Sequence, residues 1–344
     1  MWGAFSDVHD IPNDNIISER HGHNGPGGVC ISRDFAGSWK HEARGLPLRP
    51  VTSIVVDPRS PPNARVLYAG VFMGGVYKST DDGQTWTPDQ KFAGMGGHYQ
   101  TSHQRGNLVF TAFNMHPGGN VDKRTNLYYL QTEDLGQTWR NARGEPVSVP
   151  LTQTLNPALV RDYQAEKRLV YIHDLDLDRH GRPVILYITS ADFRPGPSGD
   201  PRWWTIARAT PDGWQYSEVT RANHNYTTGS LYLEDAAAWR IVGPTEPGPQ
   251  PIGSGAEVAV WISRDQGQTW AKDRDVTAGS PFNHNYVRRP VNAHPDFYAF
   301  WADGDPTGYS CSRLYFTNRA GDVVRRLPYD MEGATAVPER VAGD

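Results

Sequence analysis

A short pattern, Ser/Thr-x-Asp-x-Gly-x-Thr-Trp, occurs three times in this sequence and constrains the fold more than any other feature. The copies lie at residues 79–86, 132–139 and 263–270, and a degraded copy at residues 32–39 has Ala36 in place of the glycine. The glycine can adopt the positive φ angles of a tight turn, and the aspartate can accept hydrogen bonds from nearby backbone amides. The pattern therefore predicts a hairpin, with the tryptophan opening its second strand.

The spacing between copies indicates how many strands separate them. From residue 32 to 79 is 47 residues and from 79 to 132 is 53, close to the length of one four-stranded propeller blade. The 131 residues from 132 to 263 leave room for a blade without the pattern. We therefore predict an all-β fold, a β-propeller of six to seven four-stranded blades, with Trp86, Trp139 and Trp270 in equivalent positions between sheets.

Strand patterns bounded by Gly, Pro and Asp turns can be followed through six blades. They cover about residues 1–45, 46–92, 96–142, 169–219, 224–275 and 284–330. The segment 143–164, rich in Pro and Thr, has no clear periodicity. Either it hides a seventh blade or the chain has only six.

The repeated pattern resembles the Asp box, or bacterial neuraminidase repeat, of a propeller superfamily that includes sialidases, polysaccharide lyases and glycosidases. The resemblance implies the fold, with residues 1–344 as one propeller domain. In that superfamily the box lies on the blade rims, away from the central channel where the chemistry occurs. The boxes therefore do not distinguish an enzyme from a binding module.

Composition excludes several classes of partner. A net charge of −4 and a pI of about 6.3 provide no basic stripe, which argues against nucleic acid and against an anionic membrane surface. No apolar run approaches the roughly 20 residues of a membrane span, and the first residues do not form a signal peptide. Localisation stays unknown from the sequence: cytoplasmic by default, although relatives of this kind are often exported.

The inner strand of each blade lines the channel, so polar residues on first strands are the candidates for chemistry. In the segment 97–103, strand alternation places His98 and Gln100 on one face and Tyr99 and His103 on the other. A histidine beside an amide at a channel wall suits proton abstraction near neutral pH. We predict that His98, and not His103, faces the channel; the alternative is a histidine that bonds between blades.

The tetrapeptide Asn-His-Asn-Tyr occurs twice, at residues 223–226 and 283–286. Tyrosine can donate to a glycosidic oxygen, and arginine binds a sugar carboxylate in a bidentate manner. These copies and the nearby arginines supply further candidates, which are Tyr226, His284, Tyr286, Arg124, Arg202 and Arg288. The alternative is that the repeats are structural features of blade starts.

Two other segments carry groups of a metal-binding type. Alternation places Asp174, Asp176 and Asp178 on one face, where a hard cation such as Ca²⁺ would relieve their repulsion. A strand that runs out into a solvated turn would relieve it equally well. The segment 19–24 contains His21 and His23 and is expected to be a loop near the channel.

Residues 97–330 are similar to propeller enzymes that cleave L-rhamnose-α-1,4-D-glucuronate linkages and, more loosely, to ulvan-type uronate lyases. The similar segments are residues 97–100, 122–129, 248–250, 286–290 and 300–304. The likeness implies that His98 is the catalytic base or acid, that arginines neutralise the uronate, and that a bound cation assists. It also makes Gln100 and Gln250 candidates for substrate binding. Residues 1–92 match only a generic Asp-box propeller.

The sequence hypothesis is a lyase, or less favourably a glycosidase, that cleaves an acidic, uronate-containing polysaccharide. His98 removes the C5 proton, and His284, Tyr286 or water protonates the departing oxygen. A sialidase-like exo-glycosidase is an alternative, although the Arg-Ile-Pro tripeptide of sialidases is missing. A two-carboxylate glycosidase could recruit Asp174, Glu257 or Asp303. A non-catalytic sugar-binding or scaffold propeller is the remaining class.

Overall fold

The computed structural model describes residues 1–6, 27–42, 44–47, 49–72, 74–233, 238–331 and 333–341. The predicted loop at residues 19–24, with His21 and His23, lies outside the described residues. The chain divides into two compact units, Met1–Phe92 and Ala93–Asp344. This boundary coincides with the change of character that the sequence predicts near residue 93. That the two units form one propeller domain stays a prediction.

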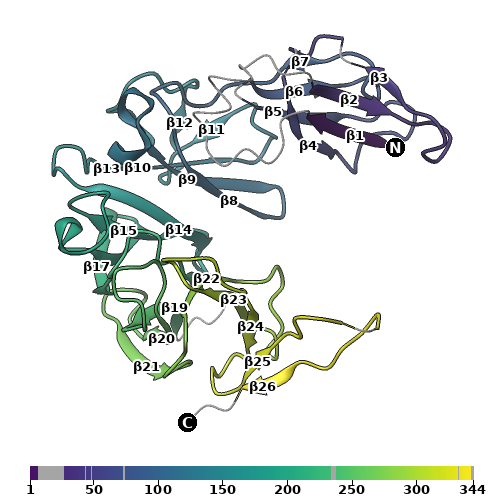
Figure 1. Ribbon diagram of the computed structural model, residues 1–344. Helices are drawn as coiled ribbons and strands as arrows, with labels where there is room; N and C mark the ends of the chain where they lie inside the picture. The colour runs from purple at the N-terminus through teal and green to yellow at the C-terminus, as the bar shows by residue number, and fades with distance from the viewer. Residues whose placement is uncertain are drawn as a thin grey trace. The chain divides into compact units, whose positions relative to one another are not determined.

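The first unit contains two antiparallel sheets (Figure 1). The first sheet has the strands β1 (Trp2–Ser6), β2 (Gly27–Ile31) and β3 (Lys40–Glu42). The second has β4 (Val51–Val56), β5 (Leu67–Val71), β6 (Gly75–Ser79) and β7 (Thr87–Pro88). Each strand pairs with the next along the chain, which is the meander of a propeller blade.

The second unit contains four antiparallel sheets. The first has β8 (Gln100–Arg105), β9 (Leu108–Met115), β10 (Thr125–Thr132), β11 (Trp139–Arg140) and β12 (Pro146–Val147), with β13 (Leu159–Arg161) paired to β10. The second has β14 (Leu169–Leu177), β15 (Pro183–Ser190), β16 (Trp203–Thr210) and β17 (Gly213–Arg221). The third has β18 (Ser230–Tyr232), β19 (Trp239–Glu246), β20 (Glu257–Ser263) and β21 (Ala271–Asp275). The fourth has β22 (Asn283–Arg288), β23 (Ala299–Gly304), β24 (Leu314–Thr317), β25 (Val324–Arg326) and β26 (Glu339–Val341).

The described residues thus form six sheets, at the places where the sequence predicts six blades. Three of the six have four strands, and the others have three, five and six. The segment 143–164 does not hide a seventh blade, because its strands β12 and β13 join the sheet of β8–β11. Among the residues that the structure describes, the helices are three short 3-10 helices: η2 (Pro117–Gly119), η3 (Val121–Lys123) and η4 (Pro197–Gly199). None of the described helices is long and apolar enough to cross a membrane.

The core of the second unit lies between successive sheets. Three clusters of buried side chains fill these spaces, and each draws on two neighbouring sheets. Phe110 of β9 shares a cluster with Leu175 of β14, and Trp204 of β16 shares one with Leu231 of β18. The sheets therefore pack face to face, so that β14 contacts both β8 and β18. This arrangement brings the starts of the inner strands together within the unit.

The Asp boxes form the predicted hairpin turns through local hydrogen bonds. In the first complete box, Asp81 Oδ1 accepts from the Thr85 amide at 2.8 Å, and Ser79 Oγ accepts from the Gly83 amide at 2.9 Å. Gly83 has φ of +87°, the left-handed region that favours glycine. The degraded box makes the same two bonds although Ala36 has φ of +73°. The aspartate and the hydroxyl side chain are therefore sufficient to fix the turn.

The prediction that the box tryptophans are equivalent is correct only in part. Trp86 is 3% exposed and lies in the core of the first unit with Val51 and Leu67. Trp139 and Trp270 are only partly buried. In the first unit the chain at Arg44 lies against Trp86, whose amide donates to the Arg44 carbonyl at 2.9 Å.

We expect Trp86→Ala to lower the free energy of unfolding by about 3 to 5 kcal/mol, because it removes a large side chain from a closed core. Trp139→Ala is expected to cost clearly less, because its ring is already partly in water. Urea unfolding followed by far-ultraviolet circular dichroism would measure both values. Equal losses for the two variants would contradict the burial difference.

Candidate active site

A buried arginine surrounded by tyrosine rings is the most distinctive polar group of the second unit. Arg124 follows η3 directly, and its guanidinium carbon lies 4.9, 4.6 and 5.3 Å from the ring centroids of Tyr99, Tyr171 and Tyr226. Its Nε donates to the Val121 carbonyl at 2.7 Å, and its Nη2 donates to the Tyr226 hydroxyl at 2.8 Å. The three tyrosines lie in or just before the first strands of three successive sheets, and Arg124 directly precedes β10. The result is a cation held in one position by cation–π contacts and hydrogen bonds.

Tyr226 and Tyr99 form the open side of this cluster. They are 42% and 52% exposed, whereas Arg124 is 5% exposed. Because Arg124 donates to the phenol oxygen of Tyr226, the phenol proton points away from the guanidinium. Tyr226 can therefore donate that proton to a group bound on the open side.

The asparagines of the repeated tetrapeptide hold Tyr226 in place. Asn285 Nδ2 donates to the Tyr226 carbonyl at 3.0 Å, and Asn285 Oδ1 accepts from the Thr228 amide at 3.0 Å. Asn225 accepts from Arg202 and donates to the carbonyls of the preceding loop. Both asparagines are thus structural, as the alternative reading of the repeat predicts, while the tyrosine of each copy is exposed.

Two histidines lie beside the cluster. His116 is buried, its ring contacts Tyr99 edge to face at 4.8 Å, and Nε2 has no hydrogen-bond partner in the described residues. Burial lowers the pKa of His116 to about 4, and the charges of Arg124 and His98 add to this effect. Gly97 permits the close approach, because a Cβ there would lie 2.9 Å from Nδ1 of His116. His116 is therefore neutral at physiological pH.

His98 is half-buried and contacts the Phe113 ring at 5.9 Å between centroids. The strand β8 begins only at Gln100, so strand alternation does not extend back to His98. Its neighbour Tyr99 is fixed by an amide hydrogen bond to Asn114 Oδ1 at 2.8 Å. His103 lies elsewhere, with Nε2 at 3.3 Å from Asp174 Oδ1. Of the two histidines, His98 is the one that directly precedes Tyr99 of the Arg124 cluster, and its charge contributes to the lowered pKa of His116.

Sequence reasoning missed two polar residues of β14, Tyr171 and His173. The Tyr171 hydroxyl and both His173 ring nitrogens are buried without a hydrogen-bond partner among the described residues. Burial raises the pKa of Tyr171 to about 12, against the opposing effect of Arg124. Burial, with a further contribution from Arg288, lowers the pKa of His173 to about 3. In the sequence, only their i, i+2 spacing indicated that Tyr171 and His173 lie on the same face of a strand.

The low pKa of His173 predicts a pH dependence of stability. The unfolded chain binds a proton at this residue below about pH 6.5, whereas the folded protein does not until about pH 3. The free energy of unfolding should therefore fall as the pH decreases from 6.5, with at most about 1.4 kcal/mol per pH unit from this residue. Urea unfolding between pH 4 and 7 should show a shallower decrease for His173→Gln than for the unchanged protein. Parallel curves would contradict the assignment.

The predicted Ca²⁺ site does not fit the groups present. Asp174 and Asp176 do share a face, but both face Arg289, and Arg105 Nη2 lies 2.8 Å from Asp176 Oδ1. Arginine side chains therefore neutralise the carboxylates that the cation was expected to neutralise. Asp178 instead accepts from the amides of the turn at 180–182. No three His, Cys, Asp or Glu side chains are grouped to hold a metal ion within the described ranges.

His284 lies in a different environment from the one predicted for a catalytic acid. It is buried and lines a cavity of about 440 Å³ with Asp303 and Tyr315. Its Nδ1 accepts from Trp301 Nε1 at 2.9 Å, so Nε2 carries the proton and donates to Ser280 Oγ at 2.8 Å. With both ring nitrogens occupied, His284 supports the packing of two sheets rather than the chemistry at Arg124.

The carboxylates considered for a glycosidase also have structural partners. Glu257 Oε1 accepts from the Ser280 amide at 2.7 Å, and Asp303 Oδ2 accepts from the Tyr315 hydroxyl at 2.8 Å. Asp174 Oδ2 accepts from the Leu231 amide at 2.8 Å. Each of the three therefore fixes a loop or strand.

Arg202 and Gln250, which the sequence predicts to bind substrate, instead form hydrogen bonds within the protein. Arg202 is 1% exposed, and its guanidinium donates to Asn225 and to the carbonyls of Gly196 and Arg194. Gly199 allows this, because a Cβ there would lie 1.8 Å from Arg202 Nη2. Gln250 exchanges hydrogen bonds with Asn283. Both have structural partners where the sequence predicts substrate contacts.

The remaining candidates are exposed. Gln100 begins β8, and Tyr286 follows Asn285 at an irregular step of β22 with φ of +56°. Arg288 lies over the Tyr286 ring at 5.6 Å. Arg288 is also close enough to His173 to lower its pKa. Arg288 therefore lies near His173, while Gln100 pairs with Phe113 in the sheet and its role in substrate binding stays a prediction.

The chain is similar in sequence and structure to several known proteins. The model of a BNR repeat-containing family matches residues 73–232. An ulvan lyase of Nonlabens ulvanivorans is 24% identical over 211 residues, which are 60% of this chain and 42% of that protein. A solved PL25 ulvan lyase superimposes with a TM-score of 0.61 at 16% identity, covering 86% of this chain and 71% of the other. The same type of lyase bound to -[GlcA(1-4)Rha3S]- gives a TM-score of 0.58 at 16% identity and the same coverage.

The chain folds as a β-propeller, and its hairpin turns carry the Asp-box pattern. The match to the curated ulvan lyase spans less than half of that protein's length. The propeller resembles the polysaccharide lyases in sequence and fold, and Arg124 and its three tyrosines lie within the matched residues 73–232.

Proposed function

We propose that this propeller is a polysaccharide lyase that cleaves a uronate-containing polysaccharide by β-elimination, at a rhamnose linked to the 4-position of glucuronate. The observation that carries the proposal is the buried guanidinium of Arg124, open on one side between Tyr99 and Tyr226. The similarity to ulvan lyases supports the reaction class. The groups around Arg124 are phenols and imidazoles, which suit proton transfer beside a bound carboxylate.

In this mechanism Arg124 binds the uronate carboxylate and neutralises its charge. The C5–H bond adjoining that carboxylate becomes acidic, because the carbanion that forms is stabilised by the guanidinium. The imidazole of His98 takes the C5 proton. The electron pair forms the C4–C5 double bond as the C4–O bond breaks.

The departing oxygen then needs a proton, and Tyr226 is the donor that the geometry supports best. Its hydroxyl proton points away from Arg124 toward the open side of the cluster. This role replaces the one predicted for His284, whose ring nitrogens are occupied. No water is consumed, so one product end carries an unsaturated uronate and the other carries a free hydroxyl.

The products distinguish this proposal from hydrolysis. We expect incubation with a rhamnose-glucuronate polysaccharide to increase absorbance at the unsaturated-uronate band, and mass spectrometry to show no gain of water across the cleaved bond. Saturated ends with the mass of one added water would instead identify a glycosidase. Absence of any cleavage across a panel of uronate polysaccharides would favour a sugar-binding or scaffold propeller.

A further inference from the structure

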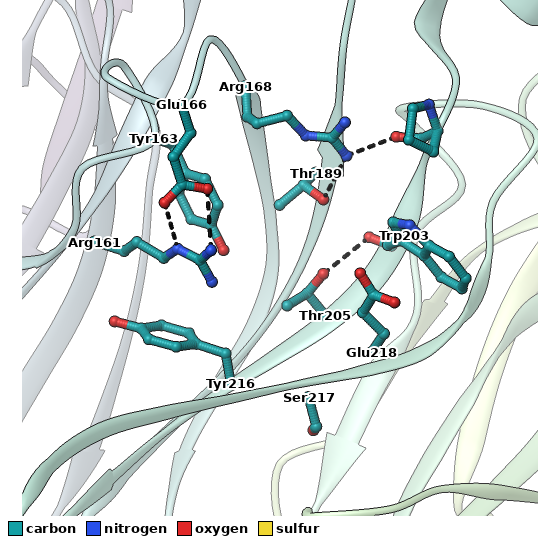
Figure 2. A pocket seen from close by; sticks show the side chains of 11 residues that line it. Arg161, Tyr163, Glu166, Arg168, Thr189, Trp203, Thr205, Tyr216, Ser217 and Glu218 are labelled. Carbon is teal, nitrogen blue, oxygen red and sulfur yellow. Dashed lines mark hydrogen bonds and ion pairs between the residues drawn. The ribbon is translucent and has the colours of Figure 1, made fainter.

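A second polar cavity lies on the outer strands of the β14–β17 sheet, lined by side chains that take no part in the Arg124 cluster. Its volume is about 490 Å³, which is within the range of small-ligand sites and large enough for one or two sugar rings. Figure 2 shows Arg161, Tyr163, Glu166 and Tyr216 on one side of it, and Arg168, Thr205 and Glu218 on the other.

One wall is a rigid aromatic surface. The guanidinium carbon of Arg161 lies 4.7 Å from the Tyr163 ring centroid and 4.5 Å from that of Tyr216. Glu166 binds the same guanidinium through two hydrogen bonds of 2.7 and 3.0 Å. The Tyr216 hydroxyl is also fixed, by donation to the Val160 carbonyl at 2.6 Å. This wall therefore loses little conformational entropy when a ligand contacts it.

The opposite wall provides a donor and an acceptor. Arg168 Nη2 donates to the Pro201 carbonyl at 2.6 Å and to Thr189 Oγ1 at 3.2 Å, which fixes the guanidinium and leaves its other N–H groups for a ligand. The Glu218 side chain is exposed and lines the cavity, and its carboxylate makes no hydrogen bond within the described residues. A carboxylate of this kind accepts two hydroxyl protons, and an arginine donates to oxygen atoms beside them.

We propose that this cavity is an accessory carbohydrate-binding site that takes a neutral pyranose unit of a glycan. Neighbouring hydroxyls of the sugar would donate to Glu218, a ring or hydroxyl oxygen would accept from Arg168, and the C–H face of the ring would lie against Tyr216. The site is separate from the Arg124 cluster and does not require that cluster to be catalytic.

The charges favour a neutral sugar over a uronate. The positive charge of Arg161 is paired with Glu166, and Glu218 and Glu166 both act electrostatically on Arg168. The acceptor on the open side is thus a carboxylate, which repels a second carboxylate and attracts hydroxyl groups. The two sites would then bind different units of one polymer: the uronate at Arg124 and a neutral sugar here.

Native gel electrophoresis through gels that contain a polysaccharide tests this site directly. The probes are three neutral polymers (a rhamnan, an arabinoxylan and a galactomannan) and polyglucuronate. We expect at least one neutral polymer to retard the full-length protein and Glu218→Gln to weaken that retardation at least about tenfold, because a hydrogen bond to a charged group is lost. Neutral polymers contain no uronate, so this result does not depend on lyase activity.

Glu133→Gln is the matched control, because Glu133 is an exposed glutamate outside the cavity. It should be retarded like the unchanged protein. Tyr216→Ala should also weaken retardation, since it removes the surface for the ring face. Retardation by polyglucuronate alone, by none of the polymers, or equally for Glu218→Gln and the unchanged protein would overturn the proposal.

Discussion

Arg124→Ala is expected to lower kcat/KM on a rhamnose-glucuronate polysaccharide by about 10³-fold. The guanidinium is the buried charge that would neutralise the uronate carboxylate, and removing one such electrostatic group typically costs two to three orders of magnitude. Arg124→Lys should recover little, because an ammonium cannot reproduce both the carbonyl contact of Nε and the donation of Nη2 to Tyr226. Initial rates of absorbance increase from the unsaturated uronate provide the measurement.

Two controls make this prediction specific. Arg140→Lys, at an exposed arginine that donates to the Gly144 carbonyl, should leave kcat/KM within about twofold. On the carboxyl-reduced polysaccharide the unchanged protein and Arg124→Ala should be equally inactive, since no carboxylate remains to be neutralised. If a folded Arg124→Ala variant keeps more than about a tenth of the activity, another residue neutralises the uronate.

His98→Ala should lower kcat by 10²- to 10⁴-fold with little change in KM, because a general base contributes about this factor to the chemical step. The ring is half-buried, so the fold should persist, as circular dichroism can verify. Steady-state kinetics over the substrate range would separate kcat from KM.

His103→Gln is the control for His98. His103 lies 3.3 Å from Asp174 and belongs to the charge network with Arg289, so its loss should affect stability more than turnover. An equal loss of kcat in both variants would show that the effect of His98 is structural. Full activity of His98→Ala would remove it from the mechanism.

The sequence predicted the sheets well because the turns that define them depend on residues that are close together in the chain. Each Asp box closes over four residues, as in the bonds from Ser79 to Gly83 and from Asp81 to Thr85. The expected equivalence of the tryptophans failed in part because the burial of Trp139 depends on what covers it, which the box does not encode.

The candidate site was harder to predict. Arg124 and Tyr226 were both expected to bind substrate, and the structure brings them into one hydrogen bond across 102 residues of sequence. Arg202 looked equally suitable, yet its donors are taken by a loop, because Gly199 leaves room for the guanidinium. Tyr171 was missed because strand alternation predicts on which face of the sheet its side chain lies, but not that the guanidinium of Arg124 packs against that face.

The sequence by itself determined an all-β propeller of six to seven blades with hairpin turns at the Asp boxes, since these depend on hydrogen bonds and side-chain alternation within a few residues. Only the tertiary structure decided which polar groups gather. Arg124, Tyr171 and Tyr226 meet because successive sheets pack face to face, and Arg289 neutralises Asp176 across 113 residues. Electrostatic and cation–π contacts act through space, so their partners are set by the packing of distant strands rather than by spacing along the chain.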